Sequence, residues 1–373
     1  MGVTVLPKRF DGKEWRRFDV FGKDGFLNIA TTDSSIDKIR LKDGDQKRVP
    51  YITRSESANG IAQFVSEKNY EFGSDEPGCI TVGLDTQTAF YQPHKFVTGQ
   101  NIQIVTGDSL NEDTAHFYIT VLKNQMDAKF NWGGNGATLS RMKRLEAMLP
   151  VTEEGELDYN YIAKYTQSKR SMLLAKYRTW VNARIAELAE PIDIPLLSRK
   201  EWKAFVIKDI ADVYSGHDIY AQERINGRTP LVTAVGTNNG IGYFVGNEND
   251  SRAEKSISVV RNGASVGKAF YHKYSALYGN DCRRMKLKYS NSEFVNLFIT
   301  QVIGMQNKAF SYSRKLGTER LQNLRIMLPV ADDGTPDYEY MEQYAKNLMI
   351  RKYKQYLAYL DSKESTAPVT ADD

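Results

Sequence analysis

The chain has 373 residues, of which 41% are hydrophobic and 26% charged, and its net charge is +4. This length allows two domains with separate cores, and the composition is typical of a globular protein. No apolar run approaches the ~20 residues that cross a bilayer, and the N-terminus lacks a secretory hydrophobic stretch. We therefore expect a cytoplasmic protein, in which Cys79 and Cys282 are free thiols because they lie far apart in non-equivalent places.

The first part of the chain predicts short strands followed by one helix. The runs Val49–Thr53, Cys79–Val82 and Ile102–Thr106 are rich in β-branched residues and are separated by turn residues such as Asn59-Gly60. The spacing of apolar residues then predicts a helix over Asp113–Met126. This part is therefore of the α+β class.

A long helix follows at Asp158–Glu190. Its apolar residues recur three or four positions apart, no Gly or Pro interrupts it, and Pro191 and Pro195 end it. A helix of this length would measure about 48 Å at 1.5 Å per residue.

The same order of elements then occurs a second time. Strands are predicted over Pro230–Ala234, Ser256–Val260 and Met285–Leu287, and a helix over Ser292–Gln306 with Asn291 or Ser292 as its N-cap. A second long helix begins at Pro336 and runs to Lys363. The acidic pairs Glu153-Glu154 and Asp332-Asp333 precede the two long helices and are interpreted as turn residues.

Matching residues show that the two parts are copies of one unit. Asn59-Gly60-Ile61 matches Asn239-Gly240-Ile241 at an offset of 180 residues, and Ala89-Phe90-Tyr91 matches Ala269-Phe270-Tyr271 at the same offset. A period of this length indicates a duplicated domain and not a solenoid. The predicted segments are a first domain at 1–157, a long helix and linker at 158–195, a second domain at 196–336, a C-terminal long helix at 337–364 and a disordered tail at 365–373.

Each long helix carries an apolar stripe that continues for more than three heptads. An antiparallel pair of helices would bury both stripes and relate the two units by a pseudo-two-fold axis; the alternative is that each helix packs on its own domain. The residues predicted to serve helix pairing or partner docking are Tyr165, Leu173, Tyr177, Val181, Leu348, Lys352, Tyr356 and Leu360.

The sequence lacks the common catalytic motifs. The four histidines do not have the spacing of a zinc hydrolase, and there is no P-loop, no Gly-x-Ser-x-Gly and no dinucleotide-binding glycine motif. An Asn/Asp-Pro-Pro-aromatic loop of an adenine methyltransferase is also missing, because the chain has no Pro-Pro. We therefore predict a non-catalytic chain with no metal and no cofactor of its own.

Polar and basic residues in the variable loops are of the types that read base edges and bind phosphates. The candidate DNA-binding residues are Arg54, Ser55, Asn59, Gln87, Lys95, Asn131, Trp132, Asn135, Arg141, Asn238, Asn239, Arg261, Asn262, Lys268, His272, Lys273, Arg314 and Lys315. Any one of them could instead be a solvated surface residue, and the two Asn-Gly pairs could be simple turns. The set gains weight because it recurs on both units.

The duplicated arrangement resembles the DNA specificity subunits of type I restriction–modification systems and of related type IIB enzymes. The resemblance lies in Pro50-Tyr51-Ile52-Thr53, Asn59-Gly60-Ile61, Leu328-Pro329-Val330 and the sequence from Pro336 to Glu342, and it covers nearly the whole chain. In the first unit Leu157 replaces the proline and Ile162-Ala163 replaces Met-Glu. The arrangement, and no single motif, carries the resemblance.

This resemblance implies two target recognition domains that each read one half of an asymmetric, bipartite site in double-stranded DNA. It also implies spacer helices that fix the gap and two methyltransferase subunits that bind S-adenosyl-methionine and methylate adenine N6 after base flipping. Restriction subunits could join the complex. Two alternatives remain open, namely the DNA-reading part of a nuclease and a non-specific DNA-binding or anti-restriction scaffold.

Overall fold

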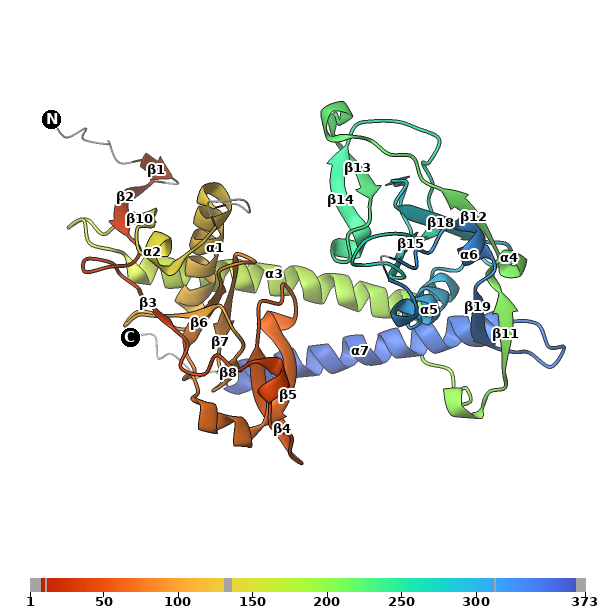
Figure 1. The fold of residues 1–373 in the computed structure, drawn as a ribbon, viewed down its shortest axis with the longest axis horizontal. Coiled ribbons are helices and arrows are strands. Elements are labelled where there is room, and N and C mark those ends of the chain that lie inside the picture. The colour runs from red at the N-terminus through yellow and green to blue at the C-terminus, as the bar shows by residue number, and fades with distance from the viewer. Residues whose placement is uncertain (1–7, 11, 131–135, 312, 367–373) are drawn as a thin grey trace. The chain divides into compact units, whose positions relative to one another are not determined.

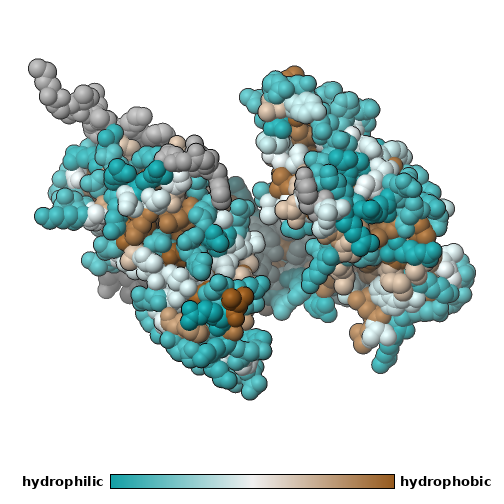
Figure 2. All heavy atoms as spheres, viewed as in Figure 1, coloured by the Kyte–Doolittle hydropathy of each residue, from teal (hydrophilic) through white to brown (hydrophobic). Residues whose placement is uncertain are grey.

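The computed structural model divides the chain into two compact units, Met1–Tyr177 (unit 1) and Arg178–Asp373 (unit 2). The structure describes residues 8–10, 12–130, 136–311 and 313–366. Within these residues, no helix is long and apolar enough to span a membrane. Figure 1 shows the elements of each unit, and Figure 2 shows that hydrophilic residues cover much of the visible surface of both.

Unit 1 contains three small sheets and a core helix. All its strand pairs are antiparallel except β4 with β8. In sheet order, the strands are β1 (Lys8–Phe10), β2 (Lys13–Asp19) and β10 (Glu146–Pro150); β3 (Asn28–Thr31), β9 (Ile102–Thr106), β6 (Cys79–Gly83) and β7 (Thr88–Gln92); and β5 (Ile61–Ser66), β4 (Lys47–Ile52) and β8 (Val97–Thr98). The helices are α1 (Glu112–Lys129), the short α2 (Leu139–Met142) and the first part of α3 (Tyr159–Leu188), with 3-10 turns η1 (Lys38–Arg40), η2 (Ala58–Gly60) and η3 (Glu67–Phe72).

Helix α1 fills the core of unit 1 and confirms the helix predicted from Asp113. The Asn111 side chain caps its N-terminus, accepting from the backbone N–H groups of Asp113 (2.9 Å) and Thr114 (3.1 Å). Tyr118, Leu122 and Met126, each four residues apart, are completely buried against the strands. Burial of each such side chain contributes about 1.5–3 kcal/mol of hydrophobic free energy.

Unit 2 repeats this arrangement with one fewer strand. Its strands are β11 (Trp202–Val206) and β19 (Arg325–Pro329); β12 (Ala211–Ser215), β18 (Cys282–Leu287), β15 (Ser256–Val260) and β16 (Ala269–His272); and β14 (Ile241–Val245), β13 (Asn226–Val232) and β17 (Leu277–Tyr278). Its helices are α4 (Ile207–Ile210), α5 (Glu293–Gly304), α6 (Thr318–Gln322) and α7 (Tyr338–Thr366), with 3-10 turns η4 (Leu197–Arg199), η5 (Ala221–Glu223), η6 (Asn238–Gly240) and η7 (Asn307–Ala309). The α+β class and the internal repeat are thereby confirmed.

Both long helices are present, and each begins in the same way. The carboxylate of Asp158 accepts from the backbone N–H of Tyr161 at 2.8 Å, and that of Asp337 accepts from Tyr340 at 2.9 Å. A lysine reaches the same aspartate in each unit: Lys13, the first residue of β2, at 2.5 Å, and Lys200, two residues before β11, at 2.7 Å. Each helix is therefore tied to its own sheet at its N-terminus.

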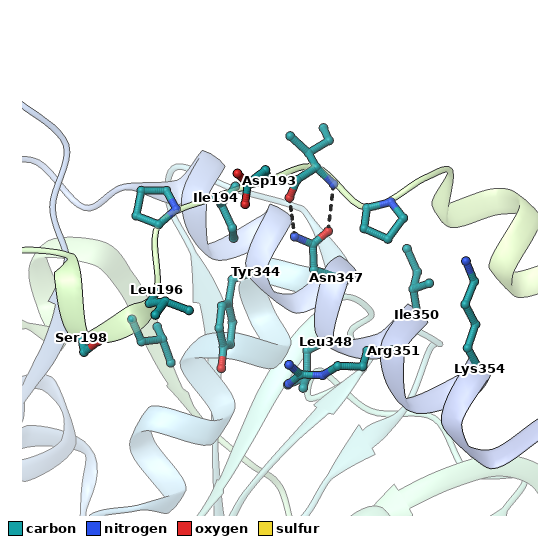
Figure 3. Close-up of a pocket in the computed structure, with 14 residues that line it drawn as sticks. Asp193, Ile194, Leu196, Ser198, Tyr344, Asn347, Leu348, Ile350, Arg351 and Lys354 are labelled. Carbon is teal, nitrogen blue, oxygen red and sulfur yellow. Dashed lines mark hydrogen bonds between the residues drawn. The ribbon is translucent and has the colours of Figure 1, made fainter. Parts of the chain in front are cut away.

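The end of α3 that belongs to unit 2 lies antiparallel to α7. The guanidinium of Arg178 donates to Asp361 at 2.8 Å, and the rings of Trp180 and Tyr353 meet edge to face at 5.7 Å. Farther on, the side chain of Asn347 bonds both backbone groups of Ile192, at 3.2 and 2.7 Å (Figure 3). The residue numbers of the partners on α7 therefore fall as those along α3 and its linker rise, which makes the two segments antiparallel. This packing of one helix on the other lies within unit 2.

The residues predicted to serve helix pairing differ in burial and in what they contact. In unit 2, Val181 and Leu360 are buried and Leu348 is half-buried, whereas Lys352 and Tyr356 are exposed. In unit 1, Tyr177 is half-buried and Leu173 is 60% exposed. Tyr165 packs edge to face on Phe117 of α1, with ring centroids 6.1 Å apart. Tyr165 therefore follows the alternative in which the helix packs on its own domain.

Candidate nucleic-acid interface

A basic, hollowed surface of unit 2 is formed by two segments, residues 261–268 and 307–320, which we call the basic face. These segments carry six basic side chains and one acidic one. Hollows of about 260 and 740 Å³ lie along them, lined by Lys268 and Lys308 in the first and by Arg261, Lys315 and Arg320 in the second. A concave surface with this excess of positive charge attracts a polyanion such as the DNA backbone.

Backbone contacts hold the two segments of the basic face together. The N–H of Leu316 donates to the carbonyl of Arg261 at 3.0 Å. Gly267 has a φ of +82°, and a Cβ at this position would stand 2.9 Å from the Cα of Asn307. Only glycine allows this close approach, so the loop and the η7 turn share one surface.

Arg261 is oriented by a neighbouring carboxylate. Its guanidinium donates to Asp281 at 2.9 Å, and its backbone N–H donates to the carbonyl of the same residue at 2.8 Å. Its Nε is buried without a partner among the described residues. An arginine fixed in this way retains further N–H donors that can bind a guanine edge or a phosphate.

Unit 1 contains an arginine–aspartate pair of its own, between Arg54 and Asp85. Arg54 is exposed and donates to Asp85, which also accepts from the side chain of Asn101 at 3.1 Å. These two bonds lower the pKa of Asp85, so the carboxylate is ionised over a wide pH range. Gln87, two residues later, has a φ of +54° and lies half-buried.

Asn59 and Asn239, predicted to contact DNA, bond to the backbone of their own units. Both adopt a left-handed conformation, with φ of 56° and 54°. The Asn59 amide donates to the carbonyl of Tyr91 at 2.8 Å, and the Asn239 amide donates to the carbonyl of Tyr271 at 3.2 Å. These are the structural turns named as the alternative, although both side chains keep some exposure to solvent.

His272 has no exposed surface, so its predicted contact with DNA is wrong for this conformation. Its Nε2 lies 2.8 Å from the hydroxyl of Ser258, and burial lowers its pKa to about 4, which leaves the imidazole neutral at pH 7. Gln92 has the same place in unit 1 and donates to Thr81 at 2.9 Å. The sequence could not distinguish a core histidine from a surface one.

The remaining candidates divide between surface positions and local contacts. Lys273, Asn238 and Arg314 are exposed, and Asn262 is half-buried. A second group bonds to groups nearby: Ser55 to the carbonyl of Ser57 (3.2 Å), Lys95 to Glu76 (2.7 Å), Arg141 to the carbonyl of Gly136 (2.7 Å) and Lys268 to the carbonyl of Gly236 (3.0 Å). Asn131, Trp132 and Asn135 lie outside the described residues.

The prediction from sequence missed two basic members of the basic face, Lys308 and Arg320. The charge run from 308 to 320 was the available signal. Both cysteines are buried free thiols, as expected, and burial raises the pKa of each to about 12. Among the described residues, no three His, Cys, Asp or Glu side chains gather in a metal-binding arrangement.

Comparisons with known proteins agree on one family. The model of the type I restriction modification DNA specificity domain matches twice, at residues 17–173 and 199–357. The type II restriction enzyme specificity subunit S.BcgI of Heyndrickxia coagulans is 30% identical over 323 residues, covering 86% of this chain and 91% of that protein.

Solved structures that match this chain include the S subunit of a type I restriction–modification system from M. genitalium. That match has a TM-score of 0.44 and 14% identity and covers 96% of both chains. The HsdS subunit of Thermoanaerobacter tengcongensis matches with a TM-score of 0.30 and 15% identity, covering 86% of this chain and 85% of that one.

Proposed function

This chain belongs to the family of type I restriction–modification DNA specificity proteins, and from that membership we propose that each unit reads one half of a bipartite, asymmetric DNA site. The chain is thus a non-catalytic specificity subunit of a restriction–modification complex, which recognises DNA sequence. Our proposal adds how recognition is divided between the two units and which partner subunits the chain directs to the DNA site.

The basic face of unit 2 is the observation that supports this division most strongly. It combines phosphate-binding charge with Arg261, whose orientation is fixed by Asp281 at 2.9 Å. Phosphate contacts position a protein, whereas oriented side chains read bases. Because unit 1 brings Arg54, Asp85 and Asn101 together from three loops whose sequences differ from those of unit 2, the two half-sites should differ.

The chain would direct two copies of a modification subunit to this site. In this proposal those subunits bind S-adenosyl-methionine and methylate adenine N6, while the specificity chain supplies no cofactor site. Restriction subunits could join the same complex. The two long helices, α3 and α7, would set the length of the gap between the half-sites.

Selection of bound duplexes from a random pool tests this proposal. The full chain is incubated together with its modification subunit, and the retained DNA is sequenced. We expect one enriched motif with two unlike halves and a constant gap. Binding that shows no preferred sequence and is lost uniformly with added salt would contradict it, as would divalent-metal-dependent DNA cutting by the chain alone.

Adding one helical turn to α3 would test the gap. An insertion of four residues lengthens an α-helix by about 6 Å. We expect the selected motif to retain both halves and change its gap. An unchanged gap would show that α3 does not set the spacing.

A further inference from the structure

An exposed phenylalanine occurs at the same position of both units. Phe64 on β5 is 50% exposed and Phe244 on β14 is 59% exposed. Each lies opposite a proline of the neighbouring strand, Pro50 in unit 1 and Pro230 in unit 2. The two phenylalanines are 180 residues apart, as are the two prolines.

An arginine precedes each proline by two residues and lies in a β-bulge. The strand register shifts between Lys47 and Val49, around Arg48, and between Asn226 and Thr229, around Arg228. Both arginines are exposed, and neither forms an ion pair within the part of the chain that the structure describes. A bulge redirects the side chain that it carries, and in both units the bulge carries an exposed arginine two residues before the proline that pairs with the phenylalanine.

The charges around each phenylalanine, with the bulge arginine included, are balanced, unlike those of the basic face. In unit 1, residues 42–48 and 66–71 carry four basic and four acidic side chains, with Lys42 bonded to Glu71 and Lys47 to Asp43. In unit 2, residues 223–230 and 245–252 carry three of each. DNA-binding surfaces accumulate positive charge, so this balance favours a protein partner over DNA.

The hairpin of unit 2 carries further exposed large side chains. Tyr243 is 46% exposed and is stacked under the guanidinium of Arg224, whose Cζ lies 3.6 Å from the ring centroid. Ile225 is 61% exposed. Exposed aromatic side chains together with arginine are typical of the centres of protein–protein interfaces.

We propose that these hairpins are two copies of one docking surface, and that each receives one copy of the modification subunit. We call them the hairpin surfaces, formed by the exposed side chains of Arg48 and Phe64 in unit 1 and of Arg228 and Phe244 in unit 2. The phenylalanine enters an apolar pocket of the partner, and the arginine meets an acidic rim of that pocket. This inference rests on the proposed function, because it requires two identical modification subunits on one specificity chain.

Repetition is the reason for assigning one kind of partner to both surfaces. The loops that carry the Arg–Asp pairs differ between the units, as reading of different half-sites requires. The hairpin surfaces instead retain arginine, proline and phenylalanine at matching positions. A feature shared by two otherwise different readers suits a partner that is the same on both sides.

Assembly of the full chain with its modification subunit tests the inference. Native mass spectrometry gives the number of bound subunits and a titration gives their affinity, for wild type, Phe64→Ser, Phe244→Ser and the double variant. We expect each single variant to weaken one of the two partner copies about tenfold, the loss typical of an interface anchor. The double variant should weaken both, while duplex binding by the specificity chain alone stays at the wild-type level.

Charge reversal provides a second set of variants that keep the phenylalanines. Arg48→Glu and Arg228→Glu should also weaken partner binding, because an acidic rim would repel the new carboxylate.

Tyr289→Ser is the matched control for the two phenylalanine-to-serine variants, since Tyr289 is 69% exposed and lies outside the hairpin surfaces. It should assemble as wild type, and thermal unfolding checks that every variant is folded.

Two outcomes would overturn the inference, and a third would overturn the proposed function on which it rests. Folded variants of both sets that assemble as wild type would remove the docking role. Loss of duplex binding with intact assembly would assign the hairpin surfaces to DNA. Wild-type chain that binds no second modification subunit would instead be a failure of the proposed function itself, and this is seen before any variant is measured.

Discussion

Units 1 and 2 use the same backbone framework to hold different side chains. In each unit a left-handed asparagine donates to a strand carbonyl, Asn59 to Tyr91 and Asn239 to Tyr271. The residue beside that carbonyl is Gln92 in unit 1 and His272 in unit 2. The comparison shows that the turn geometry is common to both units, whereas the chemistry near it can vary.

The largest effect is expected from reversing the charge of the basic face of unit 2. Lys315→Glu combined with Arg320→Glu should lower affinity for duplex DNA on the order of a hundredfold to a thousandfold, because phosphate contacts and their counterion release are lost. Fluorescence anisotropy at several salt concentrations measures both the affinity and its salt dependence.

A matched control carries the same change in net charge elsewhere in unit 2. Lys203→Glu with Lys286→Glu reverses two exposed lysines of β11 and β18. It should retain most of the affinity. An equal loss in both double variants would mean that overall charge, and not the basic face, determines binding.

The stability of unit 2 should depend on pH through His272. Its pKa is about 4 in the folded chain and 6.5 as the ordinary value. Between these values the unfolded chain binds a proton that the folded chain excludes, so stability is complete above pH 6.5 and is lost as pH falls towards 4. The loss amounts to at most about 3 kcal/mol.

His272→Gln places the unit 1 residue in unit 2 and should remove this dependence. Calorimetric unfolding of the full chain at pH 7 and pH 5 measures the effect. Between these two pH values the unfolding temperature of unit 2 should fall less in the His272→Gln variant than in the wild type. A wild-type transition that moves no more than that of the variant would contradict the role of His272.

The two Arg–Asp pairs should act separately on the two half-sites. Asp281→Ala frees Arg261 from the position fixed by the 2.9 Å bond, so discrimination at one base of one half-site should fall about tenfold. Competition between duplexes with single base changes measures this loss. Total affinity should not fall, because a negative charge is removed.

Asp85→Ala is the counterpart in unit 1 and should relax only the other half-site. Equal relaxation of both half-sites by either variant would argue against separate readers.

The smallest effect is expected at the asparagine turns. Asn59→Ala or Asn239→Ala should cost about 1–2 kcal/mol, since alanine tolerates the left-handed conformation poorly and cannot donate to the strand carbonyl. Asn59→Gly and Asn239→Gly should cost less, because glycine accepts the positive φ. Denaturant unfolding would measure both pairs, and a glycine variant as unstable as alanine would contradict the conformational explanation.

Sequence periodicity predicted those elements whose side chains repeat regularly. Helix α1 and both long helices were predicted because their apolar residues recur every three or four positions. The strand pairs β2–β10 and β11–β19 were not predicted, because each strand is partly exposed and its partner lies at least 119 residues away in the sequence. Long-range pairing of this kind leaves little local signal.

The sequence indicated which types of residue form the candidate site, but it did not indicate which of them lie on the surface. Arg261, Lys268 and Lys315 were named from the sequence and lie together on the basic face. His272 and the asparagines of the turns belong to the same residue types, yet tertiary contacts bury or engage them. Orientation of Arg261 by Asp281 depends on β15 and β18 being neighbours, which the sequence alone does not indicate.

A genome-wide map of adenine methylation tests the central claim most directly. Cells that carry the gene for this chain and those of its partner subunits are compared with cells that lack this chain and with cells that carry Asp281→Ala. The account predicts one split, asymmetric motif in the first cells, its disappearance in the second and relaxed sequence in only one half in the third. A methylation pattern that is the same with and without the chain would contradict it.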